Sequence, residues 1–296
     1  MLRLKLKRCL PAALLLLALS VIGLPLAAQK PAAHKPIKID ATKLEGVPNF
    51  RDIGGYKTSD GHTIRYNTIY RSAQLTAMTP DDNALLAPLK IRYEIDLRTP
   101  GQISQAPTHW GPNPPQAIDI PFLPHSPPPL LPPNNLDPAQ VKAQWRQNYA
   151  ITAVVNAQTI GKVLHDLAQG DEPVLIHCTV GRDRTGQTIA VLMTLLGVSR
   201  KDVYREFLLS NEYLLADGKY STEAQRRLIA TAMNLPYPPA PVDPKLQKAN
   251  SGDASWLDAF FLSIDRKYGS FDAYVRDGLK LSKEDVQSLR RRLLVN

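Results

Sequence analysis

Apolar residues recur along this chain with two different periods, and each period predicts a different kind of element. Residues Ile91–Arg98 alternate between apolar and polar positions, which predicts a β-strand. Residues Pro173–His177 are mainly apolar without alternation, which predicts a strand buried on both faces. The segments Ile64–Arg71 and Ala117–Phe122 are also predicted to be strands.

Helical patterns occupy the stretches between these strands. The sequence Thr-Pro-Asp-Asp at 79–82 joins a capping residue, a proline and two acids, so it predicts a helix to about Leu89. Further helices are predicted from Asp137-Pro138 and after the cap Ser199. The other predicted helices are about Ile151 to Leu167, Thr185–Leu196, Ala254–Tyr268, Phe271–Asp277 and Lys283–Leu294. Strands interleaved with helices predict an α/β domain with a central, mostly parallel sheet flanked by helices.

The first 28 residues have the composition of a secretory signal peptide. A basic start is followed by a long apolar run and then by Ala27-Ala28 before a polar stretch. The sequence therefore predicts a protein exported to the periplasm or secreted, without stable membrane insertion after cleavage. The alternative is an uncleaved anchor, because the apolar span 9–28 approaches the ~20 residues of a membrane-spanning helix.

Proline-rich stretches divide the remaining chain. Residues 29–45 are predicted to be a flexible lead-in, and residues 46–296 a single domain. Within that domain, residues 111–138 hold eleven prolines and predict a long surface loop. Residues 235–248 are predicted to be a second connector.

Charge and cysteine content narrow the possible partners. The formal net charge is +9, and it becomes +5 without the four basic residues of the acid-free segment 1–28. This modest excess of positive charge suits anionic substrates. The sequence contains no basic stripe with interleaved aromatics, which is the pattern that would predict nucleic-acid binding. Because Cys9 lies within the predicted signal, Cys178 would remain as a lone thiol, either buried and inert or reactive.

The segment from Val174 to Gly186 carries the candidate chemistry. A buried strand leads through a short loop directly into a helix, so backbone N–H groups can converge on an anion at the helix N-terminus. Gly181 allows the sharp turn, and the planar guanidinium of Arg184 can grip two phosphate oxygens. The same positive field would lower the pKa of the Cys178 thiol. The predicted phosphate-binding residues are Thr179, Val180, Gly181, Arg182, Asp183 and Arg184.

The loop resembles the signature of cysteine-based protein tyrosine and dual-specificity phosphatases, His-Cys-x5-Arg-Thr-Gly. The motifs at 49–55, 70–72, 95–98 and 177–186 also recur in this order in the bacterial tyrosine phosphatase family, so the resemblance spans about Gly46 to Leu294. It implies a cysteinyl-phosphate intermediate on Cys178, with no metal and no organic cofactor. The implied substrates are phosphorylated proteins, phosphotyrosine first, or phosphoinositides and inositol phosphates. Thr185 would donate a hydrogen bond from its hydroxyl to the sulfur when the sulfur leaves, and His177 would brace the loop from behind.

Asp96 and Asp183 are the two candidates for the general acid. The resemblance favours Asp96, in the Asp-Leu-Arg motif, whose alternative role is an ion pair with Arg98. Asp183 lies inside the loop, where a carboxylate beside a bound phosphate needs a proton or a cation such as Arg51 or Arg71. Asp52 is predicted to support a turn near the pocket.

The sequence also allows alternatives for the role of Arg182 and for the activity of the protein. Arg182 would either widen tolerance for polyanions such as phosphoinositides or be a solvated side chain. A rhodanese-like sulfurtransferase also uses a loop cysteine, but its loop is one residue shorter than the one here. A phosphate-binding pseudophosphatase would keep the intact loop and lack turnover.

Overall fold

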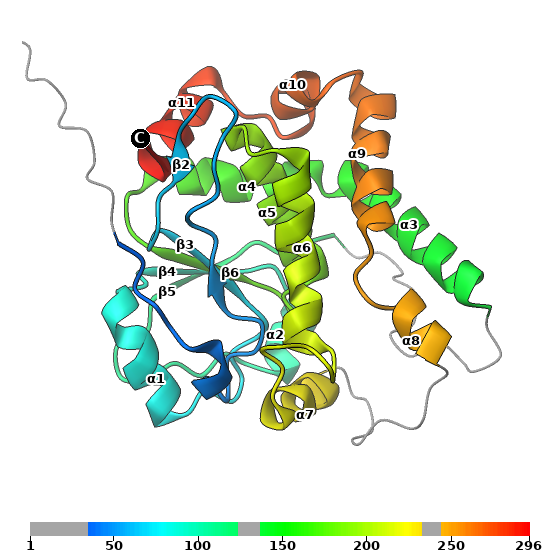
Figure 1. The fold of residues 1–296 in the computed structure, drawn as a ribbon. Helices are drawn as coiled ribbons and strands as arrows, with labels where there is room; N and C mark the ends of the chain where they lie inside the picture. The colour runs from blue at the N-terminus through cyan, green and yellow to red at the C-terminus, as the bar shows by residue number, and fades with distance from the viewer. Residues whose placement is uncertain (1–34, 124–136, 233–243) are drawn as a thin grey trace, which may run out of the picture. The chain divides into compact units, whose positions relative to one another are not determined.

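The computed structural model describes residues 35–123, 137–232 and 244–296, which form the fold in Figure 1. The predicted signal peptide lies outside the described residues, and so do positions 124–136 of the proline-rich stretch and most of the connector predicted at 235–248. None of the helices in the described ranges has the length and apolarity needed to cross a bilayer.

A five-stranded sheet lies at the centre of the fold (Figure 1), in the order β1-β3-β6-β4-β5. Its strands are β1 (Arg51–Asp52), β3 (Ile69–Ser72), β4 (Tyr93–Asp96), β5 (Gln116–Asp119) and β6 (Val174–His177). β1 is antiparallel to β3 and the other pairs are parallel, which confirms the predicted mostly parallel sheet. His177 at the end of β6 pairs with Ser72 on one side and Asp96 on the other. The carboxyl ends of the three central strands therefore meet beside one another.

Both faces of the central strand are covered, which explains why its sequence does not alternate. Val174 and Ile176 belong to the larger core, which includes residues of α4 (Ala157–Gln169) and α5 (Asp183–Leu196). Leu175 points to a smaller cluster on the opposite face, built with α1 (Pro80–Leu86). β6 is thus a buried strand, as predicted.

The remaining elements surround this centre. α3 packs along α9, and α11 packs against α4, while β2 and β7 form a separate antiparallel pair. These elements are β2 (Thr63–Ile64), α2 (Pro100–Gln105), α3 (Pro138–Val155), α6 (Arg200–Leu214), α7 (Glu223–Ala232), α8 (Pro244–Ala249), α9 (Ala254–Tyr268), α10 (Phe271–Ala273), α11 (Lys283–Leu293) and β7 (Leu294–Val295). Single turns of other helix types are η1 (Ala41–Lys43), η2 (Ala87–Leu89) and η3 (Tyr274–Gly278).

Four predicted elements are divided differently in the structure. The helices predicted to about Leu89 and at Phe271–Asp277 each pass from an α-helix into a turn of another helix type. The strand predicted at Ile64–Arg71 is split into β2 and β3, because Asn67 adopts a left-handed backbone conformation with φ 60°. The helix predicted from about Ile151 to Leu167 is divided between two helices. Its first residues form the end of α3, and Asn156 interrupts the helical conformation before α4 begins.

The packed part of the chain begins before Gly46. Leu44 is fully buried in the smaller cluster, although residues 29–45 were predicted to be flexible. Asp82 explains the difference, because its carboxylate accepts the N–H groups of Glu45 and Gly46 at 2.8 and 2.9 Å. These bonds hold the end of the segment against α1.

Candidate active site

The loop of residues 178–184, called the Cys178 loop below, joins the central strand to α5. Cys178 is 2% exposed, and the Gly181 N–H donates to its Sγ at 3.2 Å, so the loop folds back over the sulfur. Gly181 has φ 72°, and a Cβ there would lie 2.2 Å from the Ser72 carbonyl oxygen. This position accepts no side chain, which is the role predicted for the glycine.

The surroundings of Cys178 favour its thiolate. Burial raises the pKa of the thiol, and the negative charge of Asp183 adds to this effect. The positive charge of Arg184 and the nearby polar groups of Thr185 act in the opposite direction and leave the pKa below its usual value. A thiolate is the nucleophilic form of cysteine, so the site is suited to covalent catalysis.

Arg184 is held at the mouth of the loop by neutral groups. Its Nη2 donates to Thr179 Oγ1 at 3.0 Å, and its Nη1 donates to Gln102 Oε1 at 2.8 Å and to the Leu97 carbonyl at 3.2 Å. Gln102 belongs to α2, which begins with a capping box between Thr99 and Gln102. No carboxylate is paired with Arg184 among the described residues, so its charge is available to an anion.

A buried ion-pair cluster supports the loop from below. Arg71 is fully buried and donates to the Gly181 carbonyl, while its Nη1 lies 2.6 Å from Glu206. Arg51 binds the other oxygen of Glu206 at 2.7 Å. Two arginines from the N-terminal motifs are thereby tied to α6. Arg71 bonds to the loop backbone directly, whereas Arg51 bonds to Asn49 and to α6.

The segment 49–55 contributes two further supports. Asn49 has φ 60°, and its side-chain amide donates to the Val180 carbonyl at 3.1 Å. The carboxylate of Asp52 accepts the N–H of Gly54 at 2.8 Å and that of Asn67 at 2.7 Å. Asp52 therefore binds two backbone N–H groups in the connection between β1 and β3.

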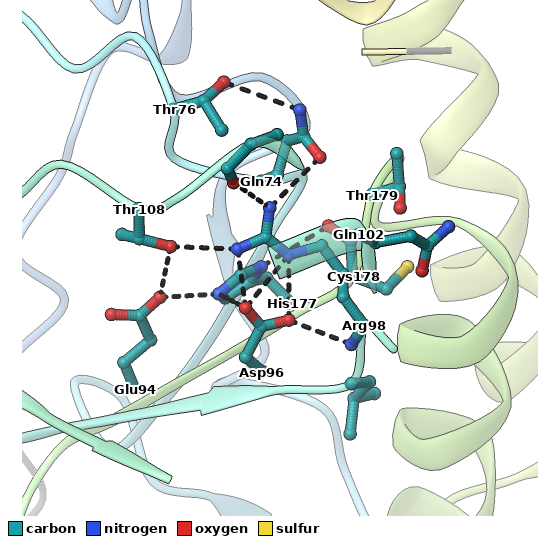
Figure 2. A network of polar contacts seen from close by, with 12 residues as sticks. Gln74, Thr76, Glu94, Asp96, Arg98, Gln102, Thr108, His177, Cys178 and Thr179 are labelled. Atoms are coloured by element: carbon teal, nitrogen blue, oxygen red, sulfur yellow. Dashed lines mark hydrogen bonds and ion pairs between the residues drawn. The ribbon is translucent and has the colours of Figure 1, made fainter. Parts of the chain in front are cut away.

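Figure 2 shows a second buried network behind the loop, where Glu94 and Asp96 face the same ring nitrogen of His177. His177 Nε2 is 2.7 Å from Glu94 Oε1 and 3.7 Å from Asp96 Oδ2. Burial alone would lower the pKa of His177, but the two carboxylates raise it above its usual value. In its protonated form His177 balances one carboxylate, and Arg98 balances the other. His177 thus lies buried behind Cys178 and is bonded to Glu94.

Glu94, Asp96 and His177 are close enough together to be considered as metal ligands, with ligand atoms within 4.8 Å of one another. They do not fit an ion, because their oxygens already accept hydrogen bonds. Arg98 donates to both oxygens of Asp96, and Trp110 donates to Glu94 Oε2 at 2.5 Å. A cation would face the guanidinium of Arg98 at this place.

Asp96 forms the ion pair that was its alternative role. Arg98 Nη2 lies 2.6 Å from Asp96 Oδ2, and Arg98 Nε lies 3.0 Å from Asp96 Oδ1. Burial would raise the pKa of Asp96, but the charges of His177 and Arg98 and the Arg98 hydrogen bonds lower it. A carboxylate held ionised in this way is a poor proton donor at neutral pH.

Asp183 has different partners. Tyr149 of α3 donates its hydroxyl to Asp183 Oδ1 at 2.7 Å, and Arg182 Nε lies 3.2 Å from the same oxygen. The cation beside this carboxylate is therefore Arg182, whereas Arg51 and Arg71 were the predicted candidates. Both of those arginines bind Glu206 instead.

Arg182 is buried, not solvated. It is 7% exposed, and its guanidinium lies 5.1 Å from the ring centroids of both Trp145 and Trp256. Its Nη1 also donates to the Asn250 carbonyl at 3.2 Å. These contacts turn Arg182 toward α3 and α9, so its role lies in local structure beside Asp183.

The tyrosine phosphatase family matches residues 42–295, nearly the whole described chain. This chain belongs to the tyrosine phosphatase family. The chain is 29% identical over 273 residues to a protein of Cupriavidus necator named as a tyrosine-protein phosphatase, covering 88% of this chain and 91% of that protein. It is 26% identical over 289 residues to the triple specificity protein phosphatase PtpB of Mycobacterium tuberculosis, covering 85% and 98%.

Among solved structures, TpbA of Pseudomonas aeruginosa matches 58% of this chain and 83% of its own, at 19% identity and a TM-score of 0.29. The family identifies the chain as a phosphoric monoester hydrolase, so the sulfurtransferase alternative is set aside.

A cavity of about 590 Å³ adjoins the Cys178 loop at Thr179. Thr179 and Gln102, which both hold Arg184, form part of its wall. The residues lining it are Gln74, Thr76, Ala77, Gln102, Gln105, Ala106, Pro107, His109, Thr179, Leu228 and Thr231. This wall is mostly neutral and hydrogen-bonding.

Several residues of this site were not predicted from the sequence. Gln102 was within reach, because Thr99-Pro100 followed by Gln102 is a capping-box pattern. Glu206 and Tyr149 carry no local signal, since each meets its partner only through the fold. Glu94 lies on a predicted strand, where its burial against His177 was not apparent.

Proposed function

We propose that this protein hydrolyses phosphate monoesters, phosphotyrosine above all, through a cysteinyl-phosphate on Cys178. The observation that carries the proposal is the closed loop around the sulfur. Gly181 N–H contacts Sγ, and Arg184 stands at the mouth without a carboxylate partner among the described residues. A phosphate dianion fits such a site because backbone N–H groups and a guanidinium can surround it.

In the first step, the Cys178 thiolate attacks phosphorus while the ester oxygen leaves. Asp183 donates a proton to that oxygen, since Asp96 is committed to Arg98. Arg184 stabilises the charge that spreads over the phosphoryl oxygens. In the second step, water attacks the cysteinyl-phosphate, Asp183 accepts a proton from it, and inorganic phosphate and the thiolate are released.

Two observations support the proposed preference for phosphotyrosine. The family is that of tyrosine phosphatases, and the cavity beside the loop can receive an aromatic leaving group. The relative PtpB is named a triple specificity phosphatase, so phosphoserine, phosphothreonine and phosphoinositide esters belong in any substrate panel. Arg182 does not support the use of polyanions, because it is buried against the stacked rings of Trp145 and Trp256.

Substitution of the nucleophile tests this function. Turnover of p-nitrophenyl phosphate and a phosphotyrosine peptide should be sensitive to vanadate and should disappear in Cys178→Ser. The matched control is Cys9→Ser, which makes the same change at the other cysteine and should retain full activity. Unchanged turnover in Cys178→Ser would refute the assigned nucleophile. Phosphopeptide binding by the wild-type protein without turnover would indicate a phosphate-binding pseudophosphatase.

We also propose that the protein acts outside the cytoplasm, on the basis of residues 1–28 alone. Fractionation of bacteria that express the full chain should place its activity in the periplasm or medium. A chain that begins at Gln29 is the control and should remain in the cytoplasm. Equal cytoplasmic retention of both forms would contradict the proposal.

A further inference from the structure

The two oxygens of Asp183 have unequal surroundings. Oδ1 accepts the Tyr149 hydroxyl at 2.7 Å and also lies 3.2 Å from Arg182 Nε. Within the described parts of the chain, Oδ2 has no hydrogen-bond partner, and the side chain is 24% exposed. One oxygen is thus anchored, and the other remains free.

The anchor comes from a rigid part of the fold. Tyr149 is fully buried, and its ring packs edge-on against Phe207 at 5.9 Å and lies 5.5 Å from Trp256. Burial and the charge of Asp183 raise the pKa of Tyr149 well above its usual value, so its hydroxyl keeps its proton and remains a donor. Trp145, one helical turn earlier on α3, stacks on Trp256 and contacts Arg182. A single face of α3 therefore holds both Arg182 and Asp183.

We propose that Tyr149 is a positioning residue that fixes Asp183 by Oδ1, so that the proton is carried and transferred by Oδ2. This inference rests on the proposed function, in which Asp183 is the proton donor, and identifies the acidic oxygen and the group that orients it. Tyr149 itself does not touch the substrate.

The asymmetry matches both steps of the reaction. When the P–O bond breaks, the Oδ2 proton moves to the leaving oxygen, and Tyr149 and Arg182 stabilise the resulting carboxylate through Oδ1. When water attacks phosphorus and the S–P bond breaks, Oδ2 takes the proton that water loses. Oδ1 keeps the same two donors throughout, so the carboxylate does not have to rotate between the steps.

The test compares two leaving groups in the variant Tyr149→Phe, which removes the hydroxyl and keeps the ring. Phenyl phosphate depends strongly on protonation, because phenol has a pKa of about 10. p-Nitrophenyl phosphate depends on it much less. The ratio kcat/KM reports the first step, so Tyr149→Phe should lose about tenfold on phenyl phosphate, as expected for a hydrogen bond to a charged group. Its loss on p-nitrophenyl phosphate should be clearly smaller.

Two tyrosines provide matched controls. Tyr204 donates to Asp258 at 2.7 Å on the surface, and the buried Tyr274 hydroxyl donates to the Ala153 carbonyl of α3 at 3.2 Å. Neither Tyr204→Phe nor Tyr274→Phe should alter the ratio between the two substrates. Equal losses on both substrates in Tyr149→Phe, or no loss on either, would overturn the positioning role. An inactive wild-type protein would instead refute the proposed function.

Discussion

Two carboxylates lie beside the Cys178 loop, and the structure treats them differently. Asp96, at the end of β4, has both oxygens bound by Arg98, and its side chain is 4% exposed. Asp183, at the start of α5, is bound through one oxygen and is 24% exposed. The comparison shows that closeness to the nucleophile does not by itself make a general acid. The acid also needs an oxygen that is free to exchange a proton.

The two residues belong to two different regions. The region behind the loop contains Glu94, His177, Asp96 and Arg98, whose charges pair with one another in a buried network (Figure 2). Such a network holds the strand ends in place, but each of its carboxylate oxygens already accepts a hydrogen bond. The region in front contains Asp183 and Arg184, where hydrogen bonds fix the groups and leave an acid oxygen and a guanidinium open.

Of the two carboxylates, Asp183 is expected to have the larger effect on activity, in the variant Asp183→Asn. The amide has the shape of the carboxylate and keeps an oxygen for the Tyr149 hydroxyl, but it carries no acidic proton. The kcat/KM on phenyl phosphate should fall by about 10²-fold or more, within the range of general-acid catalysis. The loss on p-nitrophenyl phosphate should be smaller. The measurement is steady-state kinetics on both esters at neutral pH.

Asp96→Asn is the comparison that can reverse this assignment. If Asp96 were the acid, its variant would show the strong dependence on leaving group, and Asp183→Asn would show none. Such a result would mean that Arg98 releases Asp96 during turnover.

The second expected effect concerns stability. In Asp96→Asn, Arg98 keeps its charge but loses a buried partner, because the side chains are 4% and 0% exposed. Removal of one partner from a buried ion pair costs about 3–5 kcal/mol, so the free energy of unfolding in urea should drop by roughly that amount. The exposed neighbours Arg276 and Asp277 form a matched pair, and Asp277→Asn should change it little. Similar losses in both variants would contradict the buried-pair account.

How much of this site was predictable depended on sequence distance. The chemistry of Cys178, Gly181 and Arg184 lies in seven consecutive residues, so its spacing predicted the loop, and the alternation of strands and helices predicted the sheet. Glu206 lies far from Arg51 along the chain and joins it only when α6 packs beside the sheet. Tyr149 follows Trp145 at helical spacing, a pattern that fits an apolar core equally well.

The choice between Asp96 and Asp183 shows the same limit. The Asp-Leu-Arg motif allowed an ion pair, but only the folded strand end places the Arg98 fork on both carboxylate oxygens. The short elements escaped prediction for a related reason. β7 has two residues, and it forms because Leu294 and Val295 can pair with β2, which the local sequence does not encode.

Asp52 extends the comparison to a carboxylate without a cation. Its oxygens accept two backbone N–H groups, and no ion pair to it occurs among the described residues. Burial therefore dominates and raises the pKa of Asp52 to about 6, although the hydrogen bonds oppose the shift. In Asp96, by contrast, His177 and Arg98 overcome the effect of burial and lower the pKa. The two residues should therefore contribute to stability with opposite dependence on pH.

The smallest expected effect is the pH dependence that Asp52 confers. A folded-state pKa raised to about 6 means that the native protein holds a proton that the unfolded chain has already released. The stabilisation is complete below the unfolded pKa of about 4 and is lost as pH rises through 6, with a slope of at most about 1.4 kcal/mol per pH unit. The difference in unfolding free energy between wild type and Asp52→Asn should therefore shift toward the variant as pH rises from 4 to 7. A constant difference would show that the two N–H groups balance the effect of burial on the pKa of Asp52. A shift toward wild type would show that they outweigh it, and that a carboxylate needs no cation to stay ionised in this fold.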